Sequence, residues 1–439
     1  MPLDLSLFNT VTDIRGVENF SITSVQFDSR KVGPESLFIA LKGERVDGHN
    51  FLKEVAMRGA KCAVVQEDYT GPSFGLKLGR VKNPLKALQS MAHILIKKTR
   101  GEVIGVTGSV GKTTTKDFIR ALLSLDNHVL ATEGNCNSQA GLPSSVINQW
   151  HGQETLVLEM GITQQGEMEK LVAICEPTMG VLTRVLAVHS EGVGSLETIA
   201  REKCRLFTSD RMKKAVIHQS NFTFDAVKKL TTVKVGYALD DLACDYSARI
   251  EKTKISFYEK AKLSASIDFA GESKPVVENM LAAFATCREM GIEATKLAGG
   301  FKHVQLTPHR FAHINKKETL FIDDSYNASP YAVEMAIKAM ESIPSNKKIA
   351  VLGAMKELGD LEIESHRKVA KLAMERMDSV FFLGSAWGKI KEIENIDSAR
   401  IFLDKKLLQE KLFPFIEKGD AVLVKGSNSY QMWQIIDAY

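Results

Sequence analysis

The chain has 439 residues, of which 44% are hydrophobic and 25% are charged, a composition typical of globular proteins. At about 100–200 residues per domain, this length predicts about two to four domains. The formal net charge of +4 is too small to indicate a nucleic-acid-binding protein, and the basic residues are scattered rather than clustered.

The cysteines and the apolar segments point to a cytoplasmic protein. No two cysteines form a CxxC pair, which argues against a zinc ribbon and gives no support to a disulfide framework. The first residues lack the basic start and the cleavage site of a signal peptide, and no apolar run approaches the ~18 residues of a membrane span. The cysteines are Cys62, Cys136, Cys175, Cys204, Cys244 and Cys287.

Residues 1–84 are expected to form a small α/β domain. Alternating or continuous apolar residues predict strands at 24–27, 36–41 and 61–66, and helical spacing predicts a helix at 51–59 that ends at a glycine.

Residues 85–312 are expected to form a central domain in which strands and helices alternate. This alternation predicts a parallel sheet with helices on both faces. Between 233 and 269 the pattern changes to a period of two, which predicts added antiparallel hairpins. The predicted helices are 85–98 and 113–125, and the predicted strands are 102–107, 154–160, 179–185, 214–218, 254–258 and 262–269.

Residues 313–439 repeat the alternation and predict a third, doubly wound domain of the Rossmann type. The fold class is therefore α/β with three domains. Strands are expected at 320–322, 348–352, 379–383 and 421–425, and helices at 330–343 and 364–377.

A glycine-rich loop lies between a predicted strand and a predicted helix. It reads Thr-Gly-x-x-Gly-Lys-Thr, a short form of the P-loop in which Val106 stands where the general pattern has its first glycine. Its backbone N–H groups and the helix N-terminus can bind phosphate, Lys112 can neutralise the β- and γ-phosphates, and Thr113 can ligate Mg²⁺. A glycine-rich turn that only caps a helix is the alternative. The predicted phosphate-binding residues are Thr107, Gly108, Ser109, Val110, Gly111, Lys112, Thr113 and Thr114.

Three further residues could serve the same site. Glu159 ends a strand beside the P-loop, where a carboxylate is well placed to hold the nucleotide's Mg²⁺. His189 follows the next strand and could face the same crevice, although a lone histidine is more often a hydrogen-bonded structural residue. Lys203 lies on a predicted helix, where a solvated helix face is the default interpretation.

In the third domain, Asp323 to Pro330 run from a strand into a helix. The aspartates and Asn327 either cap this turn or contact a ribose or substrate at the carboxyl end of the strand, and the residue types favour neither reading.

With these residues assembled, the chain resembles the Mur ligase family over nearly its whole length. The Lys42 to Arg45 stretch and the run from Asp324 to Ala328 point within this family to the members that add D-alanyl-D-alanine. The matching segments are 28–30, 38–45, 47–49, 107–115, 134–137, 141–143, 159–161, 189–192, 278–283, 308–310, 323–328, 351–359 and 424–427.

The resemblance implies a cytoplasmic, monomeric ligase that uses ATP and Mg²⁺ to join D-alanyl-D-alanine to UDP-N-acetylmuramoyl-tripeptide. Lys112, His189, Lys203 and Arg310 would be catalytic. Thr113, Glu159, His189 and a carbamylated Lys203 would serve the metals, while Asn279 would contact adenine, Arg310 the γ-phosphate and Asp324 the ribose. The implied substrate residues are Ser29, Arg30, Lys42, Gly43, His49, Asn135, Asn137, Tyr326, Asn327 and Lys425.

Several positions depart from the family pattern, and three alternatives stay open. A related ligase could add a diamino acid or glutamate, a P-loop kinase would share the loop, and a degenerate nucleotide-binding protein would have lost catalysis. These departures concern the binding of the amine substrate more than the binding of the ATP phosphates. They are Ser138, Arg184, Leu186, Ala354 and Asn428.

Overall fold

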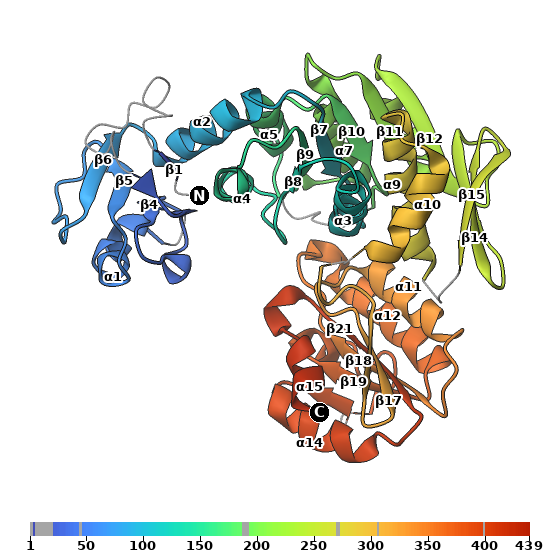
Figure 1. Ribbon diagram of the computed structural model, residues 1–439. Helices are drawn as coiled ribbons and strands as arrows, with labels where there is room; N and C mark the ends of the chain where they lie inside the picture. Colours follow the sequence, from blue (N-terminus) through green and yellow to red (C-terminus); the bar gives the residue numbers. More distant parts are fainter. Residues whose placement is uncertain are drawn as a thin grey trace.

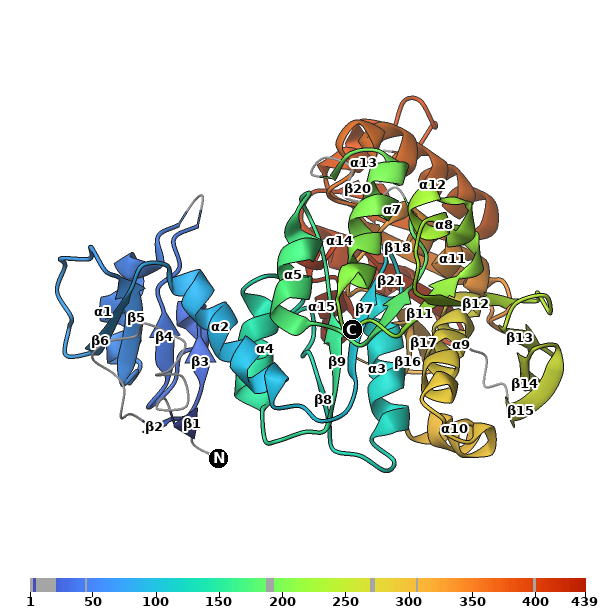
Figure 2. The ribbon, with the colours of Figure 1, turned by 90° about the horizontal axis from the view of Figure 1, so that it is seen from above.

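The computed structural model describes residues 3–4, 21–43, 46–186, 193–268, 273–304, 307–397 and 400–439. Figure 1 shows three α/β domains: the N-terminal domain lies beside the central domain, and the C-terminal domain lies below it. Seen from above, helix α2 (Pro84–Lys97) runs from the N-terminal domain towards the central one (Figure 2). The predicted fold class is thus confirmed.

The N-terminal domain contains a four-stranded parallel sheet in the order β3-β4-β5-β6. One face packs on helix α1, and the other joins the core formed with α2 and α4. Asn148 on α4 pairs with the edge strand as a neighbouring strand would, because its side chain accepts from the Val25 N–H (2.7 Å) and donates to the Val25 carbonyl (2.9 Å). The elements are β3 (Val25–Gln26), β4 (Leu37–Ile39), α1 (Leu52–Met57), β5 (Cys62–Gln66), β6 (Lys77–Val81) and α4 (Gly141–Gln149), with β1 (Leu3–Asp4) and β2 (Ser21–Ile22) as a separate pair.

The central sheet has nine strands in the order β15-β14-β13-β12-β11-β10-β7-β9-β8. Helices cover both faces, as predicted: α3, α9 and α10 on one side, and α2, α4, α5, α7 and α8 on the other. Its strands are β7 (Val103–Thr107), β8 (Val129–Ala131), β9 (Thr155–Glu159), β10 (Met179–Leu182), β11 (Lys214–His218), β12 (Val233–Leu239), β13 (Tyr246–Ile250), β14 (Lys254–Glu259) and β15 (Lys262–Asp268). Its helices are α3 (Lys112–Leu123), α5 (Glu167–Cys175), α7 (Leu196–Cys204), α8 (Asp225–Lys228), α9 (Lys274–Glu289) and α10 (Ala294–Gly300).

The antiparallel extension is smaller than the period-two pattern predicts. Strands β14 and β15 are antiparallel, but β12 and β13 pair in parallel, with Tyr237 beside Tyr246. Residues 240–245 therefore run back along the sheet, and the Asp245 carboxylate accepts a hydrogen bond from the Gly236 N–H (2.8 Å). Alternation alone predicts a strand, and not the direction in which it pairs.

The C-terminal sheet has the order β16-β17-β21-β18-β19-β20, with β16 antiparallel at one edge. Helices α11, α12 and α13 pack on one face, and α14 and α15 pack on the other. Among the described residues, no helix is both long enough and apolar enough to cross a bilayer. The elements are β16 (Ala312–Lys316), β17 (Thr319–Asp323), α11 (Pro330–Met340), β18 (Lys348–Gly353), α12 (Glu362–Arg376), β19 (Ser379–Leu383), α13 (Ser385–Gly388), β20 (Ile401–Phe402), α14 (Lys405–Leu412), β21 (Ala421–Lys425) and α15 (Trp433–Ala438).

Candidate active site

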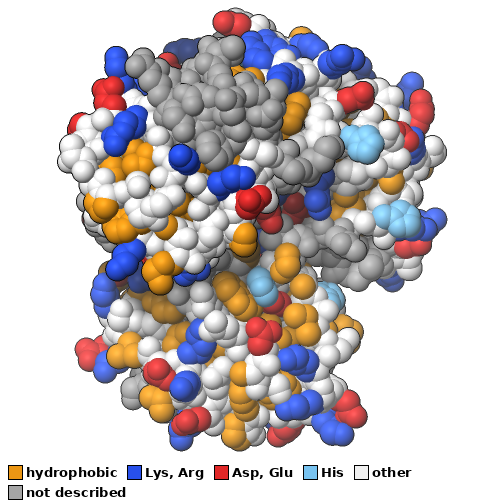
Figure 3. Space-filling view, turned by 60° about the vertical axis from the view of Figure 1, so that its left-hand side comes forward, with side chains coloured by type: hydrophobic (Ala, Val, Ile, Leu, Met, Phe, Trp, Pro, Cys, Tyr) orange, Lys and Arg blue, Asp and Glu red, His pale blue; other side chains and the backbone are white. Residues whose placement is uncertain are grey.

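A cavity of about 510 Å³ lies between the central and C-terminal domains. It is built from the P-loop, the ends of β9 and β10, the start of α9, and the turns that follow β17, β18 and β21. Figure 3 shows a furrow that separates the C-terminal domain, below, from the rest of the molecule, above. The predicted site residues that line the cavity are Ser109, Val110, Gly111, Lys112, Thr113, Thr114, Asn135, Asn137, Glu159, Asn279, Arg310, Asp324, Tyr326, Asn327 and Lys425.

The P-loop turns tightly from β7 into α3, which begins at Lys112. Two of its glycines have left-handed backbones, with φ of 149° at Gly108 and 83° at Gly111. A Cβ atom at Gly108 would lie 1.8 Å from the hydroxyl oxygen of Thr183. That hydroxyl donates to the Val110 carbonyl (2.6 Å), so Thr183 fixes the loop from the neighbouring strand. Sequence reasoning missed Thr183, which carries no motif of its own.

Two lysines converge at this loop: Lys203 is buried, and Lys112 is partly exposed to the cavity. The ammonium groups of Lys112 and Lys203 donate to the same carbonyl oxygen, that of Gly108, at 3.0 Å and 2.9 Å. Burial lowers the pKa of Lys112, with Glu159 opposing and Arg310 adding to the shift. Burial and the neighbouring Lys112 hold the pKa of Lys203 well below its ordinary value. Lys112 therefore places a cation at the P-loop, and this charge favours an anion there.

Oxygen ligands suited to a divalent cation meet at the ends of β9 and the P-loop. Glu159 is 2% exposed, and one carboxylate oxygen accepts from the Asn137 amide (2.7 Å). Its other oxygen, Oε2, is buried and has no hydrogen-bond partner among the described residues. An ionised oxygen left unpaired in a cavity is costly. Together with the Thr113 hydroxyl at the start of α3, it therefore fits Mg²⁺, which prefers hard oxygen ligands.

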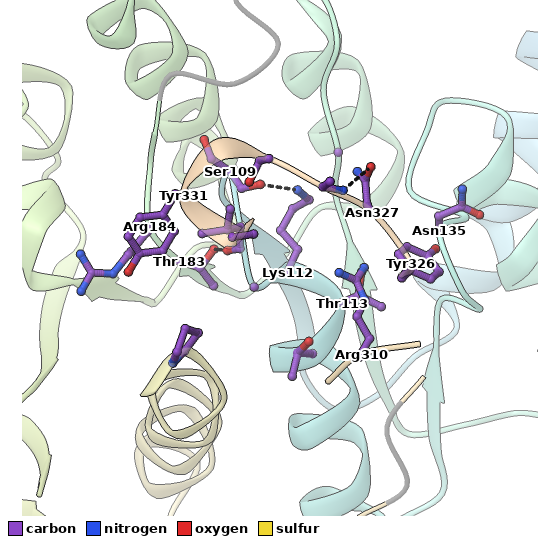
Figure 4. A pocket seen from close by; sticks show the side chains of 18 of the residues that line it. Ser109, Lys112, Thr113, Asn135, Thr183, Arg184, Arg310, Tyr326, Asn327 and Tyr331 are labelled. Atoms are coloured by element: carbon purple, nitrogen blue, oxygen red, sulfur yellow. Dashed lines mark hydrogen bonds between the residues drawn. The ribbon is translucent and has the colours of Figure 1, made fainter. Parts of the chain in front are cut away.

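Arg310 reaches the P-loop from the segment that links the two domains. Its Nη2 donates to the Thr113 hydroxyl (3.2 Å), and its guanidinium lies over the Tyr326 ring, 3.9 Å from the centroid. The residues on either side, His309 and Phe311, have positive φ values of 65° and 55°, so the backbone bends sharply at the arginine. Figure 4 shows Arg310 beside Thr113 and Tyr326, with Lys112 nearby. The chain thus brings a second cation to the phosphate-binding loop.

Asp324 and Lys425 meet at the carboxyl ends of β17 and β21. Lys425 donates to the Asp324 carboxylate at 2.6 Å, and its side chain is 3% exposed. Burial lowers the pKa of Lys425, while the Asp324 carboxylate opposes that shift. Tyr326 and Asn327 follow in the same turn and line the cavity.

The opposite side of the cavity contains a charged pair that the sequence did not reveal. Arg184 forms two hydrogen bonds, both 2.7 Å, with Glu278, which precedes Asn279 on α9. Burial alone would raise the pKa of Glu278, but the hydrogen bonds from Arg184 and the nearby His218 ring, whose Nε2 lies 3.3 Å from Oε1, lower it to about 2. Arg184 also faces the Tyr331 ring of the C-terminal domain, 5.7 Å from its centroid. Arg184, which departs from the family pattern, therefore has a partner in the central domain, Glu278, and another in the C-terminal domain, Tyr331.

Several predicted site residues lie elsewhere. Thr107 and Gly108 lie behind the cavity lining, and Lys203 reaches it only through the Gly108 carbonyl. The structure does not describe His189. The predicted substrate residues of the first domain lie in the segments between the strands of the N-terminal sheet and do not line this cavity; they are Ser29, Arg30, Lys42, Gly43 and His49.

Two of these first-domain side chains already have internal partners. Arg30 is bound by the Asp28 carboxylate (2.8 Å). The two ring nitrogens of His49 contact Asp47 (2.6 Å) and the Gln66 N–H (3.1 Å). In this conformation His49 stabilises its own domain.

Comparisons with known proteins place all three domains in one group. Family models match the chain at residues 21–94 ("Mur ligase family, catalytic domain"), 106–287 ("Mur ligase middle domain") and 309–428 ("Mur ligase, glutamate ligase domain"). The UDP-N-acetylmuramoyl-tripeptide–D-alanyl-D-alanine ligase of Bacillus subtilis is 32% identical over 434 residues, covering 95% of this chain and 93% of the relative.

Two solved structures extend this similarity to the fold. The MurF ligase of Thermotoga maritima in complex with ADP is 28% identical with a TM-score of 0.79, covering 94% of this chain and 96% of that one. MurF of Acinetobacter baumannii has a TM-score of 0.85 at 23% identity, covering 100% and 98% of the two chains, and this likeness bears on the fold alone.

Proposed function

Because the chain belongs to the Mur ligase family, we propose that it uses ATP to join D-alanyl-D-alanine to UDP-N-acetylmuramoyl-tripeptide in peptidoglycan precursor synthesis. The observation that carries this proposal is the contact of Arg310 with Thr113, because it places a cation from the domain linker on the P-loop, beside Lys112. The full-length similarity to a ligase with this printed name supports the choice of substrates.

The proposed reaction needs an activated carboxyl group. A carboxylate does not react with an amine in water, because the leaving group would be oxide. Transfer of the γ-phosphoryl group of ATP gives an acyl phosphate, which the dipeptide amine attacks as phosphate leaves. Such transfers depend on positioning and on charge neutralisation more than on a covalent catalyst.

Lys112 and Arg310 would supply positive charge to the transferred phosphoryl group, and the P-loop N–H groups would hold the neighbouring phosphates. Thr113 and Glu159 would hold Mg²⁺, with Asn137 orienting the Glu159 carboxylate. When bound, the metal would neutralise charge on the β- and γ-phosphates. The position of the cavity between two domains also suits exclusion of water from the acyl phosphate.

The other proposed residues would bind the rest of the nucleotide and the two substrates. Asn279 would contact adenine and Asp324 the ribose, and both line the cavity. Asn135, Tyr326 and Asn327 would face the peptide or the incoming amine, and the first-domain residues would bind the uridine end of the acceptor.

Lys203 and His189 are proposed to serve the metals. The depressed pKa of Lys203 favours its uncharged amine, the form that reacts with CO₂ to give a carbamate. We also propose that the protein is a cytoplasmic monomer.

The proposal is tested by supplying ATP, Mg²⁺ and UDP-N-acetylmuramoyl-tripeptide with D-alanyl-D-alanine, and separately with glutamate or a diamino acid. Phosphate release that depends on D-alanyl-D-alanine is the expected result. Release with a free amino acid instead would identify a different ligase of the family. No ADP production with any amine would indicate a protein that has lost catalysis.

A further inference from the structure

Asp324 and Lys425 are brought together by strand order rather than by closeness in sequence. Strands β17 and β21 are parallel neighbours, with Asp323 beside Val424. The Asp324 N–H continues this ladder by donating to the Val424 carbonyl (3.0 Å). The next residue on each strand therefore emerges at the same edge of the sheet, where both line the cavity.

The ammonium group of Lys425 has no donor left for a ligand. It carries three N–H groups, and it contacts three acceptors: the Asp324 carboxylate (2.6 Å), the Asp324 carbonyl (3.2 Å) and the Asn327 carbonyl (3.0 Å). This geometry argues against the direct substrate contact that the sequence suggests for Lys425. By contacting the Asp324 and Asn327 carbonyls, Lys425 holds together the two ends of the turn that these residues bound.

The Asp324 carboxylate, in contrast, keeps one oxygen available. Lys425 binds Oδ2, and Oδ1 has no hydrogen bond to any residue that the structure describes. The Asp324 side chain is 17% exposed, so its free oxygen is accessible from the cavity. A carboxylate oxygen fixed in this way can accept from adjacent hydroxyl groups.

We propose that Lys425 is a positioning residue: by holding Oδ2 of Asp324 and the Asn327 carbonyl, it presents Oδ1 of Asp324 to the ribose hydroxyls of the nucleotide. This inference rests on the proposed function, in which Asp324 contacts the ribose. It adds that the contact depends on a lysine that does not touch the nucleotide. Tyr326, on whose ring Arg310 lies, stands between the two residues that Lys425 holds, Asp324 and Asn327.

The test is the binding of ATP and of 2′,3′-dideoxy-ATP, measured by titration calorimetry on the full chain with Mg²⁺. We expect the wild-type protein to prefer ATP by about tenfold, the effect of losing a hydrogen bond to a charged group. Lys425→Met should reduce this preference to near unity, as should Asp324→Asn. The double variant should lose nothing more, because both changes remove one contact.

A second variant covers the case in which Lys425→Met does not fold. Lys425→Arg keeps the charge, and its fork can engage both carboxylate oxygens, so it should fold yet also lose the preference for ATP. Lys418→Met is the matched control, because the Lys418 side chain is 77% exposed and pairs with the exposed Glu318; the preference of this variant for ATP should stay unchanged.

Two results would overturn the inference. If the Lys425 variants weaken both nucleotides equally and keep the tenfold preference, Lys425 only stabilises the domain, and the proposed function stands. If the wild-type protein binds neither nucleotide, the proposed function itself fails.

Discussion

Lys112 on α3 and Lys203 on α7 donate hydrogen bonds to one carbonyl oxygen, that of Gly108. Burial lowers the pKa of both lysines, and the neighbouring Lys112 lowers the pKa of Lys203 further. A triphosphate on the loop would give Lys112 an anionic partner and so favour its charged form. The charge of Lys112 thus favours an anionic ligand on the P-loop of this protein.

Replacing Lys112 by alanine removes the cation nearest the proposed β- and γ-phosphates. We expect ATP-dependent phosphate release to fall at least about 100-fold, as it does when one preorganised donor to a transition state is lost. Steady-state phosphate release measures this effect. Lys418→Ala, at an exposed surface lysine, should keep wild-type turnover; near-normal turnover of the Lys112 variant would refute the assignment.

Glu159→Gln removes the charge of the proposed metal ligand while keeping its shape and its hydrogen bond from Asn137. The Mg²⁺ concentration for half-maximal activity should rise by about tenfold or more, because a neutral amide oxygen binds Mg²⁺ less strongly than a carboxylate. A magnesium titration of phosphate release tests this. Glu169→Gln is the matched control, since Glu169 is largely exposed and pairs with Arg205. An unchanged magnesium requirement in the Glu159 variant would exclude it as a ligand.

Arg310→Lys keeps one positive charge but loses the planar fork that contacts Thr113 and lies over Tyr326. Lysine cannot reproduce this geometry, so we expect kcat to fall by about 100-fold with a smaller change in KM for ATP. Full kinetic curves for ATP separate the two constants. A variant that changes KM alone would indicate that Arg310 only binds the ground state.

His366 should make stability depend on pH. It is fully buried, its Nε2 accepts from the Met355 N–H (3.0 Å) and its Nδ1 contacts the Glu362 carbonyl (2.7 Å). Burial lowers the pKa of His366 below its ordinary value of 6.5, although the Glu362 carbonyl opposes this. The folded state therefore disfavours the proton. The stabilisation is present above pH 6.5 and is lost as pH falls through the depressed folded pKa.

Thermal unfolding at pH 7.5 and pH 5.5 measures this dependence. Glutamine can donate and accept as the neutral ring does, but it does not titrate. The drop in Tm between the two pH values should therefore be smaller in His366→Gln than in the wild-type protein. Equal drops would show that other groups cause the acid sensitivity.

The sequence predicted motifs made of adjacent residues well, but it predicted poorly which distant side chains contact each other. Lys112 and Thr113 follow from a strand, a glycine-rich turn and a helix that are adjacent in the chain. Asp324 and Lys425 were each identified, but their contact depends on β17 lying beside β21, which no local pattern encodes. The pairing of Arg184 with Glu278 was missed for the same reason.

Other features left no sequence signal. Thr183 fixes the P-loop through a single hydroxyl, and threonine at a strand end is unremarkable. The parallel pairing of β12 with β13 depends on the path of residues 240–245.

The central claim is that this chain forms an amide bond between two particular substrates. The most direct measurement is mass spectrometry of the product after incubation with ATP, Mg²⁺, UDP-N-acetylmuramoyl-tripeptide and D-alanyl-D-alanine. We predict a UDP-linked product heavier than the acceptor by one dipeptide less one water, formed with one ADP per bond. Unchanged acceptor, with wild-type protein that is folded and binds ATP, would contradict the account.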